Sequence, residues 1–418
     1  MHLVQSIKND FPIFNQLEDD SLIYFDNAAT TQKPKSVIDA ICHYYEHNNA
    51  NIGRSVYNLS MKSFEIFENS RSTIQKFINA PNSQDIVFTK GTTESINFIA
   101  EAFAKQELSS GDEVIISGME HHSNLLPWQR VCEEIGAKLR IINLNKDGSI
   151  DLENYQSLLT GKVKLVAVAH VSNVFGTVNP VKEMIALAHE KNIPVLVDGA
   201  QAVAHLPVDV QELNADFYCF SGHKMYGPMG IGVLYIKSEH QERMKMFQVG
   251  GGVAKKVGYH SVSELMPIPS RFEAGTPNVS GALGIAEAAR YILSIGFEKI
   301  QDNEKKMFLE TVAILEEVEK IEIYGDLNSE SSIISFNVKD IHPYDIGNIF
   351  NGHNIAVRTG VHCAVPLIDS LELLGTVRIS FGIYNSLDEI VKLKEALIDI
   401  KPMDWTINRP NVRFLVEQ

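Results

Sequence analysis

The sequence predicts an α/β fold, with a large domain built on a mainly parallel sheet and a smaller α+β domain towards the C-terminus. Three observations predict it. Short apolar runs alternate with helical patterns between residues 22 and 237. Most of these runs are apolar throughout, which is typical of strands covered by helices on both faces. After about residue 265 the order changes to two long helices, followed by strands and shorter helices.

The first part of the chain supplies the strands and helices of the large domain. Strands are expected at 22–25, 85–89, 112–117, 138–144, 164–171, 194–198, 217–221 and 232–237. Helices are expected at 60–78 and 181–191. In the first helix, one face is marked by the apolar side chains Met61, Phe64, Phe67, Ile74, Phe77 and Ile78. A helix with such a stripe packs the stripe against a core.

The second part predicts the smaller domain. A turn and a long helix occupy 275–300, and a second helix follows at about 302–320. Strands are then expected at 321–325, 332–338, 354–358 and 376–381, and helices at 342–351 and 386–400. We therefore predict an N-terminal segment 1–20 that packs on the small domain, a large domain 21–290, a small domain 291–405 and a tail 406–418.

Composition narrows the class of protein. The chain has 418 residues, 44% of them apolar, and a net charge of −15. A nucleic-acid-binding protein is expected to show a basic patch, and a protein that docks on anionic lipid also needs basic residues, so neither class is favoured. No apolar run is long enough to span a bilayer, and residues 1–14 have no continuous apolar stretch typical of a signal peptide. We expect a soluble cytoplasmic protein.

The cysteines are few and far apart. They are Cys42, Cys132, Cys219 and Cys363, and no two are spaced as a CxxC pair. A disulfide framework or a zinc site is therefore not expected, and no metal is predicted. Free cysteines usually behave as small buried hydrophobes, and we expect this of the first three. Cys363 differs because it lies in a Gly- and Pro-punctuated loop, "RTGVHCAVP" at 358–366. It could be structural, a metal ligand or a nucleophile.

The run "SGHKMYGPMGIG" at 221–232 carries the clearest chemical signal. Lys224 sits in a polar loop after an apolar strand and before a Gly-rich turn. Such a lysine is most often an ordinary exposed turn residue. It can also form a Schiff base with an aldehyde cofactor if its pKa is lowered. Ser221 and His223 flank Lys224 and could hold a phosphate.

Another strand end supports the Schiff-base interpretation. Asp198 ends the apolar run of "VDGAQ" at 197–201, where α/β sheets place ligand-binding groups. An aspartate there is often only a helix cap. A pyridoxal cofactor, however, needs an acid at its pyridine nitrogen so that the ring can accept electrons. Gln201 could hydrogen-bond the phenolic oxygen of the same ring.

Two further runs complete the pattern. "TKGTTESINF" at 89–98 opens a helix with Gly, Thr92 and Thr93, which suits a phosphate or an ordinary N-cap. "MEHHSNLLPW" at 119–128 offers an imidazole that could stack on a ring, although a strand-end His pair is more often structural or half of a metal site. Together these runs offer a phosphate cradle, a stacking group, a ring acid and a Schiff-base lysine. This combination favours pyridoxal 5'-phosphate.

The same runs carry a family resemblance. "YFDNAATTQKP", "GTTESIN", "EHHSNLLPWQ", "HVSNVFGTVNP", "VDGAQAV", "SGHKMYGP", "RFEAGTPN" and "RTGVHCA" resemble the SufS-type (group II) cysteine desulfurases, which are class V, fold-type I pyridoxal phosphate enzymes. The resemblance runs from residue 24 to about 402. It implies a fold-type I transferase that acts as a homodimer in which Thr276 reaches the partner's phosphate.

The resemblance also implies a role for each matching residue. Catalytic roles fall to Lys224, Cys363 and His121, and His121 also stacks on the cofactor ring. The cofactor is held by Thr92, Thr93, His121, Asp198, Gln201, Ser221, His223, Lys224 and Thr276. The substrate is bound by Asn173, Arg358 and Arg378. A guanidinium suits a substrate carboxylate because its paired N–H groups match the two oxygens.

The implied reaction converts L-cysteine to L-alanine. Cys363 attacks the substrate sulfur as a thiolate and becomes a persulfide, which supplies a SufE- or SufU-like acceptor for iron–sulfur cluster assembly or a related pathway. A thiolate needs a microenvironment that lowers the cysteine pKa or a nearby base. His362, Arg358 and His121 are candidates, and the sequence does not rank them.

Three departures from the family pattern bear on acceptor choice and substrate scope. Gly53 stands where the family has a His, "VAKK" occupies 253–256, and Val361 stands in place of the second His of the cysteine loop. Two alternatives to a desulfurase follow. One is a selenocysteine lyase, or another pathway-specialised class V enzyme, acting on L-selenocysteine. The other is a binding protein that has lost catalysis, which the presence of Lys224, Asp198 and Cys363 argues against.

Overall fold

The computed structural model describes residues 2–15, 22–53, 56–327, 332–398 and 400. A seven-stranded sheet forms its centre, with the strands in the order β2-β8-β7-β6-β5-β3-β4. Their bounds are β2 (Ile86–Thr89), β3 (Glu113–Ser117), β4 (Lys138–Ile142), β5 (Val163–Ala169), β6 (Val195–Asp198), β7 (Phe217–Ser221) and β8 (Gly232–Ile236). The neighbours from β4 to β7 pair in parallel, and β8 pairs antiparallel with both β7 and β2. The sheet is therefore mainly parallel, as predicted.

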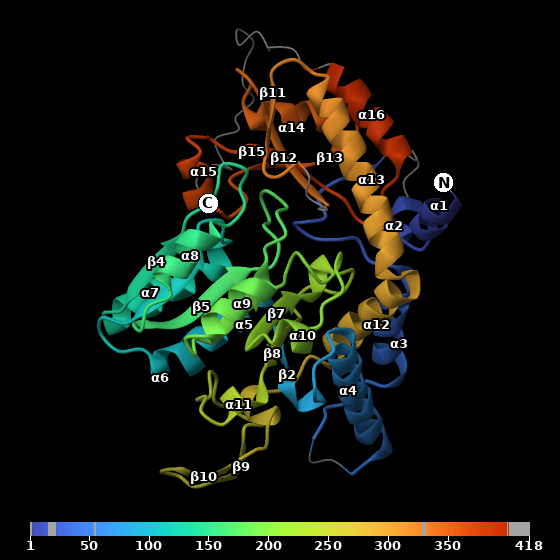
Figure 1. The fold of residues 1–418 in the computed structure, drawn as a ribbon. Coiled ribbons are helices and arrows are strands. Elements are labelled where there is room, and N and C mark those ends of the chain that lie inside the picture. Colours follow the sequence, from blue (N-terminus) through green and yellow to red (C-terminus); the bar gives the residue numbers. More distant parts are fainter. Residues whose placement is uncertain (1, 16–21, 54–55, 328–331, 399, 401–418) are drawn as a thin grey trace, which may run out of the picture.

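Helices cover both faces of this sheet (Figure 1). One core packs strand residues against α4 (Asn58–Phe77), α8 (Leu152–Leu158), α9 (Val181–His189), α10 (Val210–Leu213) and α12 (Val279–Ile295). The other packs them against α5 (Thr92–Ile99), the π-helical turn Ala100–Ala104 and α7 (Leu126–Ile135). Along β3, Ile115 joins the first core while Val114 and Ile116 join the second. This alternation explains why the strands are apolar throughout.

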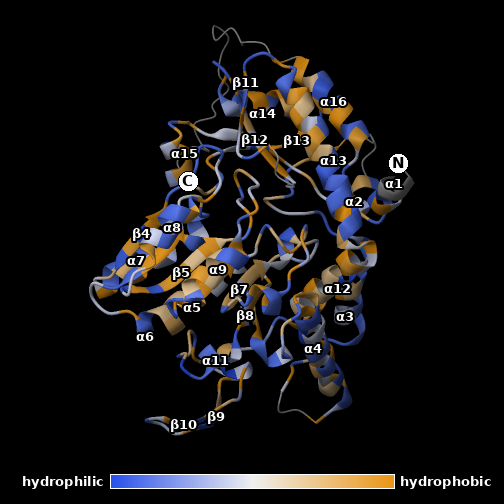
Figure 2. Ribbon diagram, viewed as in Figure 1, coloured by the Kyte–Doolittle hydropathy of each residue, from blue (hydrophilic) through white to orange (hydrophobic). Residues whose placement is uncertain are grey.

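The remaining elements around the large sheet are short. They are α3 (Lys35–His47), α6 (Lys105–Glu107), α11 (Ser238–Gln241) and the hairpin of β9 (Ala254–Val257) with β10 (Val262–Leu265). The hairpin projects from the lower end of the molecule in Figure 1. In Figure 2, apolar residues follow the strands and the inner sides of the helices, and polar residues lie on their outer turns.

A second, four-stranded sheet lies above the first in Figure 1. Its order is β11-β12-β15-β14, and every pairing is antiparallel. The strands are β11 (Ile321–Tyr324), β12 (Ile333–Val338), β14 (Arg358–Gly360) and β15 (Thr376–Ser380). The helices of this region are α13 (Phe297–Glu316), α14 (Pro343–Gly352), α15 (Val365–Ser370) and α16 (Leu387–Ile398). Most of these α+β elements agree with the predicted ones, but α13 begins about five residues earlier than expected and α15 was not predicted. The single strand expected at 354–358 is divided between β13 (Ile355–Ala356), which pairs in another sheet, and β14.

One expected strand belongs elsewhere. The sequence places 22–25 among the strands of the large sheet, and this prediction is wrong. β1 (Ile23–Tyr24) pairs in parallel with β13 (Ile355–Ala356) in a separate two-stranded sheet. Ile23 and Phe25 are buried in the core of the second sheet. A short apolar run predicts a buried strand but does not indicate which sheet the strand joins.

The N-terminal residues form α1 (His2–Asn9) and α2 (Pro12–Asn15). Lys8 pairs with Glu389 of α16 at 2.6 Å. The centroid of the Phe11 ring lies 4.6 Å from that of Tyr384, 5.8 Å from that of Tyr291 and 6.0 Å from that of Tyr226. These contacts tie the segment to elements of both sheets. The three boundaries between the four predicted segments stay a prediction, and the tail 406–418 lies outside the described residues.

Three cysteines were expected to be buried. Cys132 and Cys219 are buried in α7 and β7, but Cys42 is exposed on α3, so the prediction for Cys42 is wrong. The helix side chains Met61 and Phe64 are exposed too, although Phe67, Ile74 and Phe77 of the same stripe are buried. Only the second half of the predicted stripe on α4 therefore packs on the core of this chain.

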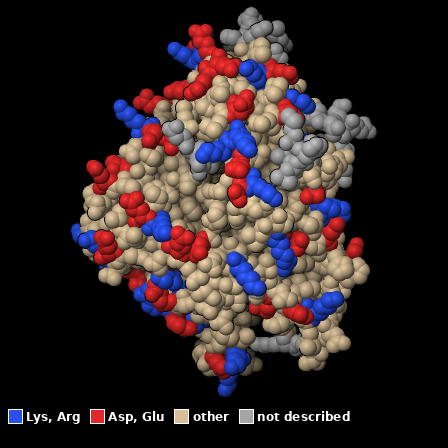
Figure 3. Space-filling view, turned by 45° about the vertical axis from the view of Figure 1, so that its right-hand side comes forward, with Lys and Arg blue, Asp and Glu red and all other residues tan. Residues whose placement is uncertain are grey.

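The surface carries both signs of charge. Acidic side chains are interspersed with lysines and arginines on the face drawn in Figure 3. None of the helices described here has the length and apolar character needed to cross a membrane.

Candidate active site

A cavity of about 240 Å³ lies at the carboxyl ends of β5, β6 and β7. It brings together eleven of the residues predicted from the sequence: Thr92, Thr93, His121, Asn173, Asp198, Gln201, Ser221, His223, Lys224, Arg358 and Arg378. The large sheet and its loops supply nine of them, and the second sheet supplies the two arginines. Parallel strands expose their carboxyl ends at one edge, which is why residues so far apart in sequence converge here.

Two predicted residues lie apart from this cavity wall. Cys363 is half-buried, and its Sγ lies 3.8 Å from Nη2 of Arg358, which does line the cavity. Thr276 is exposed and is not among the residues that line the cavity. A role for Thr276 in this chain's own site is therefore not apparent from the structure, and its expected reach into a partner subunit stays a prediction.

The start of α5 forms a corner of the cavity. Gly91 is the N-cap residue of α5, and no side chain caps the helix there. The interpretation of Thr92 or Thr93 as an ordinary N-cap is therefore ruled out. The Thr92 N–H donates to Ser221 Oγ at 2.8 Å, and the two hydroxyls also lie 2.8 Å apart. A Cβ on Gly232 would lie 2.5 Å from Gly91 Cα, so glycine is needed there for β8 to approach this corner. The N–H groups of a first helical turn and the helix dipole suit a phosphate.

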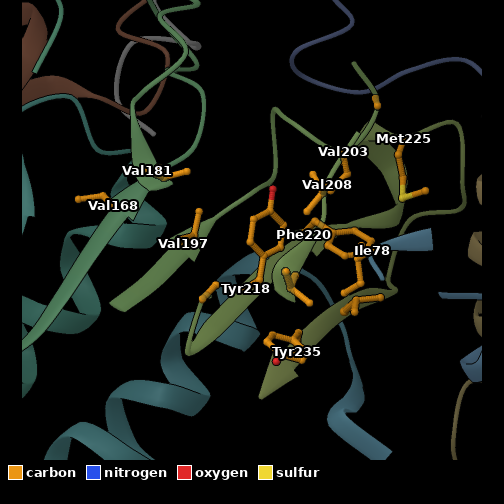
Figure 4. Packing of buried hydrophobic residues seen from close by; sticks show 14 of the residues in the cluster. Ile78, Val168, Val181, Val197, Val203, Val208, Tyr218, Phe220, Met225 and Tyr235 are labelled. Atoms are coloured by element: carbon orange, nitrogen blue, oxygen red, sulfur yellow. The ribbon is translucent and has the colours of Figure 1, made fainter. Parts of the chain in front are cut away.

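Asp198 ends β6 inside the cavity. It is buried, and burial raises its pKa. Its Oδ1 accepts a hydrogen bond from the Ala200 N–H at 2.9 Å, which leaves the second oxygen available to a ligand. The next residue must be glycine, because a Cβ on Gly199 would lie 2.2 Å from the ring of Tyr218. Tyr218 itself packs among Val197, Phe220 and their neighbours (Figure 4).

Gln201 follows in the same loop and is also buried. Its Nε2 donates to the Ala28 carbonyl at 2.8 Å, and the residue lines the cavity. The loop at 28–29 therefore fixes this side chain beside Asp198.

Lys224 ends a 3₁₀ turn, Gly222–Lys224, directly after β7. Burial lowers the pKa of its amine to about 8. The preceding carbonyl, that of His223, accepts hydrogen bonds from the Thr31 N–H at 3.0 Å, the Thr30 hydroxyl at 3.0 Å and Lys33 Nζ at 3.1 Å. These donors hold the backbone of the lysine in place. Lys33 is not anticipated by the sequence reasoning, because nothing in "TTQKP" shows which carbonyl it reaches.

His121 is a neutral imidazole. Burial, together with the nearby Lys224 charge, lowers its pKa to about 3. The Ser123 N–H donates to Nδ1 at 3.0 Å, so the proton of the neutral ring is assigned to Nε2. The residue before it, Glu120, was not predicted. Glu120 is buried and accepts from the Ala169 N–H at 3.0 Å and Asn124 Nδ2 at 2.6 Å, and burial raises its pKa to about 7.

The two arginines face each other across β14 and β15, where Arg358 and Arg378 are direct register partners. Arg378 is buried and donates to the Asn173 carbonyl at 2.8 Å and to Asp26 Oδ1 at 3.2 Å. Its Nε has no hydrogen-bond partner among the described residues. This unused buried donor suits an anionic ligand. Asp26 could have been found from the sequence, because it follows a strand as Asp198 does.

The loop that carries Cys363 has an unusual backbone. His362 and Cys363 have φ of 52° and 55°, in the left-handed region that non-glycine residues rarely adopt. Asn173 Nδ2 donates to the His362 carbonyl at 2.8 Å, and the His362 ring lies 2.8 Å from the Thr376 hydroxyl. Burial lowers the pKa of His362 far below its usual range, so it is neutral. Among the candidates for stabilising a thiolate, Arg358 is the cation in contact with the sulfur.

The three departures from the family pattern lie outside the cavity wall. Gly53 lines a separate hollow with residues of α4. The run 253–256 leads into the β9–β10 hairpin. Val361 is partly exposed in the cysteine loop, next to His362. None of them contributes a side chain to the cavity.

These groups fit the cofactor that the motifs predict. A backbone corner suits a phosphate, a buried carboxylate suits a protonated ring nitrogen, a neutral imidazole suits a ring face, and an amine of lowered pKa suits an aldehyde. The fold and the site thus define a fold-type I pyridoxal phosphate enzyme with a half-buried cysteine beside an arginine of the cavity wall.

Comparison with known proteins gives the family. Residues 23–393 match the family described as Aminotransferase class-V, and the chain belongs to it. A cysteine desulfurase of Shigella flexneri is 42% identical over 395 residues, covering 94% of this chain and 97% of the relative. The solved apo structure of a cysteine desulfurase from Thermococcus onnurineus NA1 has a TM-score of 0.90 and 40% identity, covering 94% of this chain and 96% of that one.

A second solved structure agrees. It is a cysteine desulfurase from Escherichia coli in an S-sulfonic acid form, with a TM-score of 0.87 and 34% identity, covering 94% of this chain and 97% of that one. The predicted fold class, an α/β fold-type I enzyme, is confirmed by these likenesses together with the observed sheet.

Proposed function

We propose that this chain is a pyridoxal phosphate-dependent cysteine desulfurase that converts L-cysteine to L-alanine and keeps the sulfur on Cys363. The observation that carries the proposal is the position of Cys363, whose Sγ lies 3.8 Å from Arg358, an arginine that lines the same cavity as Lys224 and Asp198. Cys363 is half-buried, unlike the buried Cys132 and Cys219. The relatives named cysteine desulfurase support the same activity.

The cavity binds the substrate through charge. Arg378 offers an unpaired buried N–H, and Arg358 lies opposite it, so the pair suits the carboxylate of L-cysteine. Asn173 lines the same wall and ties it to the cysteine loop through the His362 carbonyl. The substrate is thereby oriented with its side chain towards Cys363.

When bound, pyridoxal phosphate supplies an aldehyde for amines and a ring that accepts electrons from Cα. Thr92, Ser221 and His223 would hold its phosphate, and Asp198 and Gln201 its ring. Lys224 Nζ, with its lowered pKa, takes the proton from the substrate Cα and returns one later.

Sulfur transfer then falls to Cys363. Its thiolate attacks the sulfur of the substrate, so that an S–S bond forms as the substrate's Cβ–S bond breaks. The electron pair of the broken bond goes to Cβ, which takes up a proton and becomes the methyl group of alanine. Arg358 stabilises the thiolate before the attack. The products are alanine and an enzyme persulfide, and no external oxidant is needed.

The persulfide needs an acceptor. We propose a SufE- or SufU-like protein that feeds iron–sulfur cluster assembly, and a homodimer as the working form. The exposed apolar side chains Met61 and Phe64 on α4 support a subunit contact. Thr276 is exposed and does not line its own cavity, which supports a contribution to a partner's site. The cytoplasmic location expected from the sequence stays a prediction.

The test is a paired assay with L-cysteine and L-selenocysteine. The wild type, Cys363→Ala and Cys42→Ala are compared for alanine formation, with Cys42 as an exposed cysteine remote from the site. Cysteine turnover should be lost in Cys363→Ala and kept in Cys42→Ala. A wild type with negligible cysteine turnover, together with selenocysteine turnover that persists in Cys363→Ala, would instead indicate a selenocysteine lyase.

A further inference from the structure

His122 contacts the cysteine loop at two points. Its backbone N–H donates to the Cys363 carbonyl at 2.8 Å. Its ring Nε2 accepts a hydrogen bond from the Val365 N–H at 3.2 Å. The two bonds bracket Cys363, one at the residue itself and one two residues further along the chain. The second His of the "EHHSN" run therefore reaches the loop of the nucleophile rather than the cofactor cavity.

The loop needs such contacts because of its backbone. His362 and Cys363 both have positive φ, a conformation that persists only where the surroundings hold it. The side chain of Asn173 holds the His362 carbonyl. On the other side of the sulfur-bearing residue, His122 is the side chain that holds the chain at Val365.

The ring of His122 is suited to accept this bond. Burial lowers its pKa, which favours the neutral ring. A neutral imidazole that accepts at Nε2 carries its proton on Nδ1. The same lone pair would be needed for a metal, so the half-metal-site interpretation of the histidine pair conflicts with the observed bond. The His122 ring therefore serves as a hydrogen-bond acceptor for this loop, which the sequence alone does not reveal.

We propose that His122 is a positioning residue for the persulfide-forming step, holding the Cys363 loop so that the sulfur faces the cavity. The inference rests on the proposed desulfurase function. His122 does not touch the reacting atoms and acts through the backbone at 363 and 365. Sulfur transfer requires the two sulfur atoms to meet in a defined geometry, and small displacements of a reacting group slow such steps strongly.

The test uses two variants of His122 in the holoenzyme. His122→Gln keeps an acceptor near the position of Nε2, and His122→Ala removes it, while both keep the backbone N–H. The control is His43→Ala, an exposed histidine on α3. Three rates are measured: the absorbance change of bound cofactor on adding L-cysteine, persulfide formation on Cys363 by peptide mass, and alkylation of Cys363 by iodoacetamide without substrate.

Loss of the acceptor should slow persulfide formation about tenfold, the order expected for one hydrogen bond, and leave the absorbance change intact. Alkylation of Cys363 should become faster in His122→Ala because the loop is released. His122→Gln should restore both rates, and the control should match the wild type. If His122 only supported the fold, we would expect neither rescue in His122→Gln nor a normal absorbance change in His122→Ala.

Several results would overturn the inference. One is a wild-type rate of persulfide formation in His122→Ala. Another is an equal slowing in Ala and Gln variants, and a third is loss of the absorbance change, which would place the effect at the cofactor. If the wild type makes no alanine, the proposed function fails. The alkylation rates then still decide whether His122 holds the loop, so the two failures are distinguishable.

Discussion

Arg358 and Arg378 lie directly opposite each other on the antiparallel strands β14 and β15. Like charges in such a pair destabilise a sheet, commonly by a few tenths of a kcal/mol up to about 1 kcal/mol. Asp26 offsets part of this through its 3.2 Å contact with Arg378. The remaining positive charge is directed into the cavity, where an anion would compensate it. We attribute the arrangement to binding of the substrate carboxylate.

The first prediction concerns this pair. Arg378→Lys keeps the charge but loses the planar fork, so KM for L-cysteine should rise about 10- to 100-fold, given roughly 1.5–3 kcal/mol for a hydrogen bond to a charged group. The effect should fall on KM more than on kcat, because the carboxylate is held throughout the reaction. Steady-state kinetics of alanine formation measure it. Arg140→Lys, exposed on β4, serves as the control, and an unchanged KM in Arg378→Lys would refute the assignment.

The second prediction concerns reconstitution of the apoprotein. A free amine must be unprotonated to react with an aldehyde. Because burial lowers the pKa of Lys224 to about 8, the rate of pyridoxal phosphate incorporation should rise with pH and level off soon above pH 8. Cofactor absorbance at a series of pH values measures this rate. A rate that still climbs steadily beyond pH 10 would mean that the amine is not perturbed.

The third prediction concerns Lys33, whose pKa burial lowers to about 8 from 10.5. Between these values the unfolded chain binds a proton that the folded chain has released, so this residue's contribution to stability rises with pH. The stability of wild type relative to Lys33→Met should therefore increase between pH 8 and 10.5, by up to about 3 kcal/mol before allowance for solvent screening. Urea unfolding at both ends of this range measures it.

The control for Lys33 is Lys146→Met, an exposed lysine in a loop. It should show no change in its stability difference over the same range. A pH-independent difference between wild type and Lys33→Met would contradict a lowered pKa for the Lys33 amine at the His223 carbonyl.

The fourth prediction concerns Asp216, which directly precedes β7 at the amino end of that strand. Burial alone would raise its pKa, but hydrogen bonds from His189 and His240, each 2.7 Å long, lower it to about 2. Its contribution is therefore complete above about pH 4 and is lost as the pH falls towards 2. Asp216→Asn should cost about 3 kcal/mol of unfolding free energy at pH 7.

The same difference should shrink at pH 3, which chemical denaturation at the two pH values can check. Glu133→Gln, an exposed change from acid to amide on α7, should leave stability nearly unchanged at both. A cost for Asp216→Asn that does not depend on pH would show that the carboxylate charge plays no part.

Much of the site could be predicted because its residues lie at strand ends. Asp198, Ser221 and Lys224 follow apolar runs that the sequence marks clearly, and parallel strands bring such ends to one edge. The composition of the α5 start likewise indicates an anion site. Asp26 shows the same local pattern, a carboxylate directly after the apolar run 22–25.

What could not be predicted depends on contacts between distant segments. The pairing of β1 with β13, the reach of Lys33 to the His223 carbonyl and the bond from Val365 to His122 join residues that no local pattern connects. Cys42 was misjudged because a cysteine in a helical pattern says little about which side of the helix is covered. Arg358 and Arg378 could both be predicted as site residues, but only the register of β14 with β15 shows that they lie opposite each other.

The most direct test of the central claim is a single turnover followed by mass analysis of the Cys363 peptide. The holoenzyme is mixed with about one equivalent of L-cysteine and trapped without reductant. The account predicts that this peptide gains one sulfur atom while one alanine forms per gain, and that Cys363→Ala forms neither. Alanine that forms at the wild-type rate with no added sulfur on Cys363, or with the sulfur on Cys42 instead, would contradict it.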